Sequence, residues 1–241
     1  MSCEPIASIL TNKHPEDRRR GGFTLLEILV AMVIFAIVVG LIFASFEGVF
    51  SNADHMTAAG GMIEMGNACM DRITRDLVAL HVTTYPRYSP PDIDDKPDIY
   101  RVQGTLESMG GDSFAMLRFA SLSHLAFNQQ PREGIAEIVY YVQEDPTGQR
   151  VLKRSDKLYP YPDFEPDPSD PVLCEKVKSF KLVYYSAKGD EREEWDSESD
   201  DFDYSTPRAV GITLVIGDDD ASYEFYTEIA FPMYRFKEVK R

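Results

Sequence analysis

The residues whose types and spacing could do chemistry lie near the N-terminus, where a basic segment meets an apolar one. Three arginines, residues 18–20, precede the pair Gly21-Gly22, and Phe23 begins a stretch with one early carboxylate, Glu27. Hydrolysis after Gly22 would release the basic segment and leave a cationic α-amine on Phe23. A carboxylate inside an apolar helix costs several kcal/mol unless it has a partner. The pattern therefore predicts proteolytic processing, after which the amine of one subunit neutralises the Glu27 of another.

The element that must position these groups is a long apolar helix. Every residue from Ile28 to Phe46 is uncharged, and a membrane span needs about 20 apolar residues. The preceding arginines predict a cytoplasmic N-terminus, with most of the chain across the membrane. Two other interpretations stay open: an uncleaved signal anchor with the same topology, and a secretory signal peptide cut near Ala44. Glu27 favours cleavage before the helix, because the new amine would compensate its charge.

Residues 20–27, Arg-Gly-Gly-Phe-Thr-Leu-Leu-Glu, stand directly before this apolar helix. The string resembles the class III signal of type IV pilins and type II secretion pseudopilins. The resemblance implies that a prepilin peptidase cleaves after Gly22, so that residues 1–22 are a removed leader. It also implies methylation of the Phe23 amine and a docking role for Glu27 in subunit assembly.

The absence of proline between Pro15 and Pro86 allows one helix from Phe23 to about Leu80. We expect a transmembrane half over 23–46, a periplasmic half over 47–82 and a weak point at Gly60-Gly61. Apolar residues at three- and four-residue steps predict a stripe that packs on a sheet. These residues are Met62, Met65, Cys69, Ile73, Leu77 and Leu80. The intervening charged residues are expected to face water: Glu64, Asp71, Arg72, Arg75 and Asp76.

The rest of the chain, residues 83–241, is predicted to form a β-rich globular domain. Its first part, 83–112, contains four prolines and is predicted to be a long loop. Alternating apolar residues then predict six strands: Ser113–Phe119, Ile135–Gln143, Gln149–Arg154, Val177–Ser186, Ala209–Gly217 and Ser222–Phe231. Short turns predict two hairpins, through 145–148 and 217–220. The predicted fold class is α+β, a pilin-like spine helix packed on antiparallel sheet.

Several strand patterns, each of moderate specificity, narrow the family by their order and spacing: Ser113–Phe119, Glu137–Gln143, Val177–Tyr185, Trp195 and Pro207–Leu214. They resemble the J-type minor pseudopilins of type II secretion. The resemblance implies a single-pass protein of the bacterial inner membrane, with its C-terminal domain in the periplasm. It also implies a place at the tip of the periplasmic pseudopilus, with I- and K-type minor subunits and the major pseudopilin as partners, in support of protein export. A minor type IV pilin of an adhesion or DNA-uptake pilus is the alternative.

Charge and motifs exclude several classes of function. The chain has 40 acidic and 25 basic residues and a formal charge of −15, so no nucleic-acid partner is expected. It contains no phosphate-binding G-x-x-x-x-G-K-[ST] loop, no H-E-x-x-H and no G-x-S-x-G. The histidines His55, His81 and His124 are far apart in the sequence. We therefore expect no catalytic residue, no cofactor and no enzymatic activity; a membrane-anchored periplasmic hydrolase is the competing class.

An acidic segment surrounds Trp195, with nine carboxylates between Asp190 and Asp203. Oxygen-rich loops can bind calcium, but the spacing fits no EF-hand. It predicts a solvated acidic loop and no metal ligand. The aspartates 218–220 likewise predict a polar hairpin turn.

The cysteines and the tyrosine pairs each allow two outcomes. Cys3, Cys69 and Cys174 form no C-x-x-C pair. Cys69 and Cys174 are either a disulfide in an oxidising compartment or two buried free thiols. In Tyr140-Tyr141 and Tyr184-Tyr185, neighbouring rings point to opposite sheet faces, so we expect one in the core and one available to a partner.

Overall fold

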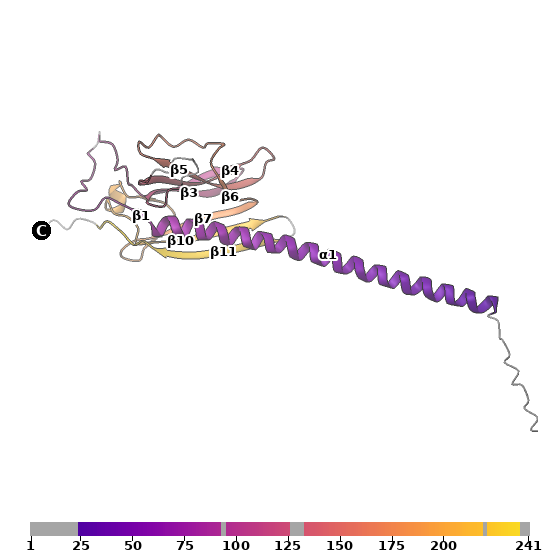
Figure 1. The fold of residues 1–241 in the computed structure, drawn as a ribbon. Coiled ribbons are helices and arrows are strands. Elements are labelled where there is room, and N and C mark those ends of the chain that lie inside the picture. The colour runs from indigo at the N-terminus through magenta and orange to yellow at the C-terminus, as the bar shows by residue number, and fades with distance from the viewer. Residues whose placement is uncertain (1–23, 93–94, 126–132, 219–220, 237–241) are drawn as a thin grey trace, which may run out of the picture. The chain divides into compact units, whose positions relative to one another are not determined.

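The computed structural model describes residues 24–92, 95–125, 133–218 and 221–236, without the side chains of 46–55, 57 and 58. The chain divides into two compact units, residues 1–55 and 56–241. Helix α1 (Leu25–Val78) contributes residues to both (Figure 1). Its bounds agree with the predicted helix. It stays helical through Gly60 and Gly61, so the predicted weak point does not interrupt it.

The larger sheet, sheet A, is antiparallel throughout and has the order β6-β5-β4-β3-β2-β9, with β1 paired to β3. Its strands are β1 (Leu80–His81), β2 (Gln103–Met109), β3 (Asp112–Ser121), β4 (Ala136–Glu144), β5 (Arg150–Leu158), β6 (Val172–Cys174) and β9 (Trp195–Asp196). Strand β2 corrects the prediction of a loop over 83–112. Gly104 is its one buried residue, so the strand lacks the apolar alternation by which strands are recognised.

The smaller sheet, sheet B, is also antiparallel and has the order β11-β10-β7-β8. Its strands are β7 (Val177–Tyr185), β8 (Glu191–Arg192), β10 (Ala209–Gly217) and β11 (Ser222–Ala230). All six strands predicted from alternation are present, within a few residues of their expected ends. The β4–β5 and β10–β11 hairpins are present as well, although Asp219 and Asp220 of the second turn lie outside the described residues.

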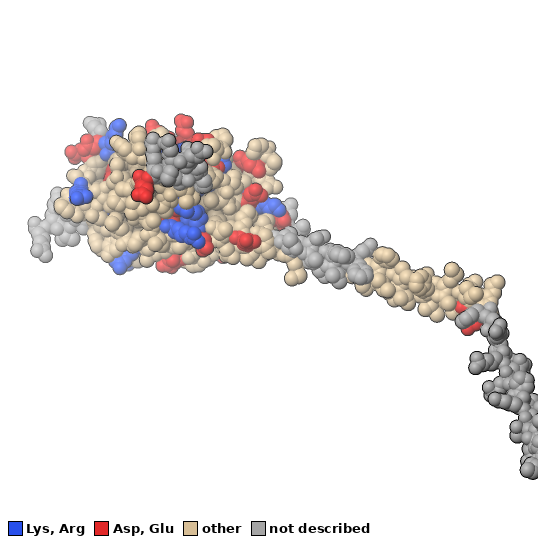
Figure 2. All heavy atoms as spheres, viewed as in Figure 1, with Lys and Arg blue, Asp and Glu red and all other residues tan. Residues whose placement is uncertain are grey.

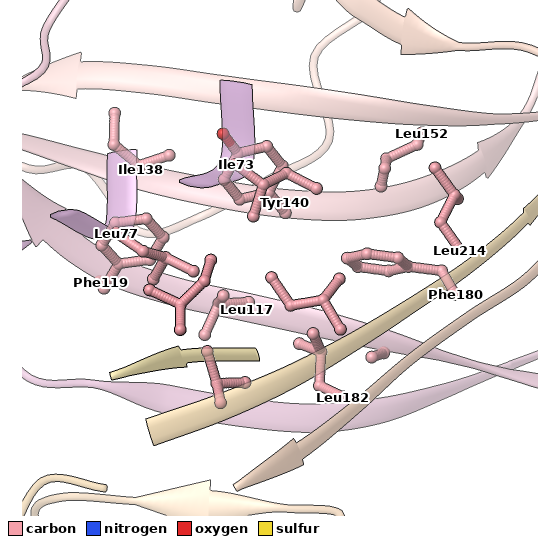
Figure 3. Close-up of a cluster of buried hydrophobic side chains, with 14 of the residues drawn as sticks. Ile73, Leu77, Leu117, Phe119, Ile138, Tyr140, Leu152, Phe180, Leu182 and Leu214 are labelled. Carbon is pink, nitrogen blue, oxygen red and sulfur yellow. The ribbon is translucent and has the colours of Figure 1, made fainter. Parts of the chain in front are cut away.

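The core lies where the second half of α1 meets both sheets. Ile73 and Leu77 of the helix have no exposed surface. They pack with Leu117 and Ile138 of sheet A and with Phe180 of sheet B in one cluster (Figure 3). The arrangement is α+β and pilin-like, as predicted, and the apolar stripe of the helix is the surface that the sheets bury.

The acidic segment contains two short strands, so the prediction of a loop is wrong, although most of its carboxylates are exposed. Strand β8 pairs with β7 of sheet B, whereas β9 pairs with β2 of sheet A, so the segment joins an edge of each sheet. Trp195 is buried. The centroid of its ring lies 4.8 Å from that of Phe202, which belongs to the short 3-10 helix η1 (Asp200–Phe202). The segment is held because its one aromatic residue belongs to the core.

Arg235, in the C-terminal tail, holds the other end of this segment. Its guanidinium is 1% exposed and lies 2.5 Å from Glu198 Oε1 and 2.6 Å from the carbonyl of Ser197. It also lies over the ring of Tyr88, 3.3 Å from the centroid. Glu198 is therefore a buried partner of an arginine, and the tail closes the domain at this end.

Candidate assembly site on helix α1

The first turn of α1 fixes the backbone position of Glu27. The carbonyl of Thr24 accepts hydrogen bonds from the backbone N–H groups of Glu27 and Ile28, and the Thr24 hydroxyl accepts one from Glu27 N–H at 3.2 Å. Thr24 is thus the N-cap, and the T-x-x-E spacing is that of a capping box. A carboxylate in the first turn also faces the positive end of the helix dipole. The exposed Glu27 side chain is compatible with the helix and available to a partner.

The segment that follows has apolar side chains with no protein around them. Leu25–Ser45 is 21 residues long with a mean hydropathy of 3.0, and none of it is buried within the described part of the chain. Phe35 is 70% exposed and Phe43 is 66% exposed. Figure 2 shows this stretch as a run of uncharged side chains, apart from an acidic one near its start. It is long and apolar enough to cross a membrane, so lipid or other subunits must cover it.

At the other end of α1, a buried ionic network holds the helix to sheet A. Asp76 has no exposed surface. Its carboxylate accepts hydrogen bonds from Arg154 Nε at 2.6 Å and from the hydroxyl of Tyr140 at 2.5 Å. The hydroxyl of Ser123 donates at 2.5 Å, and Arg72 of the preceding helical turn completes the set. The prediction that Asp76 faces water is therefore wrong.

A second carboxylate balances the charge of this network. Asp156 Oδ1 faces Nδ1 of His124 at 2.6 Å, and Oδ2 accepts hydrogen bonds from Arg154 at 2.6 Å and from Leu125 N–H at 2.9 Å. Burial alone would raise the pKa of Asp156, but these hydrogen bonds and the charge of Arg154 outweigh it and lower that pKa. Burial opposes the charge of Arg154 as well, and the two aspartates outweigh it and raise its pKa. Both groups are therefore held in their charged forms.

Comparison with known protein families assigns the two parts of the chain separately. Residues 17–43 match the prokaryotic N-terminal methylation motif. Residues 44–226 match the family of type II secretion system protein J. The chain belongs to the type II secretion system protein J family. A search of curated proteins found no match.

Membership in the J family settles the class of function. The family consists of pseudopilins of type II secretion, which are structural subunits without enzymatic activity. Membership in this family excludes the alternative of a membrane-anchored periplasmic hydrolase. It also favours a secretion pseudopilus over a type IV pilus. The methylation motif with its apolar helix also indicates inner-membrane anchoring, processing by prepilin peptidase and association with other pseudopilins.

The structure describes only part of the predicted site in this J-family pseudopilin. Glu27 is exposed in the first turn of α1, whereas Gly22 and Phe23 lie outside the described residues. Among the described residues, no group of three or more His, Cys, Asp and Glu side chains is placed to hold a metal ion. The assignments of cleavage, methylation and docking to single residues remain predictions.

Two residues of the J-family domain depart from their predicted surroundings. One member of the pair Tyr140-Tyr141 was expected to be available to a partner, but both are buried: Tyr141 is 4% exposed, and its hydroxyl donates to Asp170 at 2.9 Å. Asp76 stands three residues after Ile73, on the apolar stripe itself. That spacing was the available signal, but its partners Tyr140 and Arg154 are remote in the sequence. Local periodicity therefore could not identify the network.

Proposed function

We propose that this chain is a minor pseudopilin that assembles at the tip of the periplasmic pseudopilus and supports protein export across the outer membrane. The observation that carries the proposal is the match of residues 44–226 to the J family, directly after a methylation motif. The uncovered apolar segment Leu25–Ser45, with Glu27 at its start, supplies a surface for assembly. Its partners are the I- and K-type minor pseudopilins and the major pseudopilin.

The proposed maturation removes residues 1–22 by cleavage after Gly22 and methylates the amine of Phe23. The mature chain then has a transmembrane half over 23–46, a periplasmic half of the same helix over 47–82, and the globular domain over 83–241. Glu27 follows the new amine by one helical turn. An amine and a carboxylate from neighbouring subunits neutralise each other in the apolar phase, which gives assembly its register.

Glu27→Gln tests this assignment, because it removes the charge and keeps the size. We expect the variant to be processed normally, so that its intact mass is that of residues 23–241 plus one methyl group. Capture of the I- and K-type subunits from solubilised membranes should fall by about tenfold, as expected for the loss of ~1.4 kcal/mol of pairing. Secretion of a reporter substrate should fall with it.

Glu47→Gln is the matched control, since Glu47 follows the apolar segment in the sequence. It should leave mass, capture and secretion unchanged. Normal capture and secretion by Glu27→Gln would contradict the docking role. A wild-type mass that includes residues 1–22, or one that begins near Ala44, would contradict the proposed cleavage. Antibody labelling along isolated pseudopili, instead of at one end, would contradict the tip position.

A further inference from the structure

Cys69 and Cys174 come from different elements and meet in the core. Cys69 is 1% exposed on α1, and Cys174, the last residue of β6, has no exposed surface. The Sγ of Cys174 lies 4.0 Å from the carbonyl oxygen of Met65. That oxygen belongs to the helical turn before Cys69, and helical side chains tilt toward the N-terminus. The Cys69 side chain is therefore expected to point to the same place, and both cysteines belong to the same buried cluster, where they are free thiols.

The mature chain contains no other cysteine. The full sequence has three, and the third, Cys3, lies in the proposed leader. Removal of residues 1–22 thus leaves two thiols that are already neighbours in the fold. Exported domains fold in an oxidising compartment, where neighbouring thiols are converted to disulfides.

We propose that Cys69 and Cys174 form a disulfide that fastens α1 to β6, an inference that rests on the periplasmic location proposed above. The two thiols give up two protons and two electrons as the S–S bond forms. The acceptor is the disulfide of an external thiol oxidoreductase. Its S–S bond breaks through a mixed disulfide and leaves a dithiol.

The bond must form before the helix packs on the sheets. The neighbouring Cys174 sulfur and burial both raise the pKa of the Cys69 thiol, and the thiolate is the form that reacts. Once packed, the two thiols are unreactive and inaccessible. In the emerging chain they are still reactive and accessible. After packing, the same burial protects the disulfide from reductants.

The disulfide would reinforce a short edge strand of sheet A. Strand β6 has three residues, and its register with β5 shifts between Leu152 and Lys153. Few backbone hydrogen bonds therefore hold it. A covalent bond from β6 to α1 closes a loop of about 100 residues and keeps the spine helix attached to the domain that it carries.

Thiol labelling of the full-length chain tests the proposal. Secretion-competent cells are quenched in acid, unfolded without reductant, treated with N-ethylmaleimide, and the intact mass is measured. We expect a chain of residues 23–241 that takes up no label, and two labels after reduction. A mature chain that takes up two labels before reduction would overturn the disulfide.

Cys3 distinguishes this failure from failure of the proposed processing. A chain that keeps its leader and takes up one label would support the disulfide and contradict the cleavage. A chain that keeps its leader and takes up three labels would overturn both.

Thermal unfolding in detergent gives a second measurement, with fluorescence of the single tryptophan, Trp195, as the probe. Unfolding, reduction with dithiothreitol and refolding in its presence should lower the midpoint of the wild-type chain by about 10 °C. The control is the Cys69→Ala/Cys174→Ala double variant, whose midpoint should not respond to dithiothreitol. An equal lack of response in the wild type would overturn the proposal.

Discussion

Asp76 shows how one residue determines where the spine helix docks. Its carboxylate has no exposed surface and is bound by Arg154, Tyr140, Ser123 and Arg72. A fully apolar residue of similar size could give equal stability. An apolar contact, however, would tolerate rotation or sliding of the helix, whereas this carboxylate can be satisfied in one position only. We infer that the network fixes the rotation of α1 against sheet A.

Asp76→Asn should therefore destabilise the domain strongly. The amide keeps the shape but removes the anion of Arg72 and one of the two anions of the buried Arg154, which costs about 3–5 kcal/mol. Urea unfolding of the full-length chain in detergent, followed by Trp195 fluorescence, measures the loss. Asp71→Asn is the control on the same helix, because Asp71 is 74% exposed and lies 3.9 Å from Arg75. It should cost less than about 1 kcal/mol, and equal losses in the two variants would contradict the role given to Asp76.

At the scale of elements, one glycine sets the distance between α1 and sheet B, and another sets the distance between the two sheets. A Cβ on Gly66 of α1 would collide with the ring of Phe225 on β11. A Cβ on Gly104 of β2 would collide with the hydroxyl of Tyr184 on β7. Glycine is used here because an aromatic ring occupies the place of its missing side chain. The close approach brings helix and sheet B, and sheets A and B, into one core.

Gly66→Ala should lower the stability of the domain even though alanine is the better helix former. The clash with Phe225 forces an overpacked core, which costs about 1–3 kcal/mol, against a gain of up to ~1 kcal/mol in helix propensity. Gly60→Ala separates the two effects. No described atom lies within 4 Å of the Cβ that it adds, so it should stabilise by up to ~1 kcal/mol. Adding Phe225→Leu to Gly66→Ala should restore part of the lost stability. If Gly66→Ala stabilised the domain as Gly60→Ala does, the Phe225 ring would be shown to move aside freely, which would contradict the role given to Gly66.

The sequence predicts those elements whose signal is local. Strands β7, β10 and β11 alternate in apolar character, and their ends were predicted within one residue. The methylation motif likewise lies in consecutive residues. Asp76 and Glu198 were missed because each is placed by a partner far along the chain, Arg154 and Arg235 respectively, and no periodicity records such a contact. Strand β2 pairs with the next strand, β3, and was missed because it lacks apolar alternation.

At the scale of the whole molecule, the net charge of −15 is separate from the charges that hold the fold. The buried network pairs the carboxylates of Asp76 and Asp156 with Arg72 and Arg154, so its own balance is even. The excess of acid is not part of this network, and exposed charge favours solubility and not stability. Acid should weaken the domain through the buried pairs, because protonation there removes hydrogen-bond acceptors from guanidinium groups.

Asp156 gives this expectation a sign and a pH range. The pKa of Asp156 is lower in the folded chain than its unfolded value of about 3.9, so the folded state favours the ionised form. Its contribution is then complete above the unfolded pKa and is lost as the pH falls through the folded pKa. The urea midpoint of the wild-type chain, followed by Trp195 fluorescence, should be steady from about pH 7 to pH 5 and fall below about pH 4.

Asp156→Asn removes the ionisable group, at a cost of about 1–3 kcal/mol at pH 7. The curves of the two proteins should therefore converge as the pH falls toward about 2, whereas curves that stay parallel would show that Asp156 takes no part in the acid response.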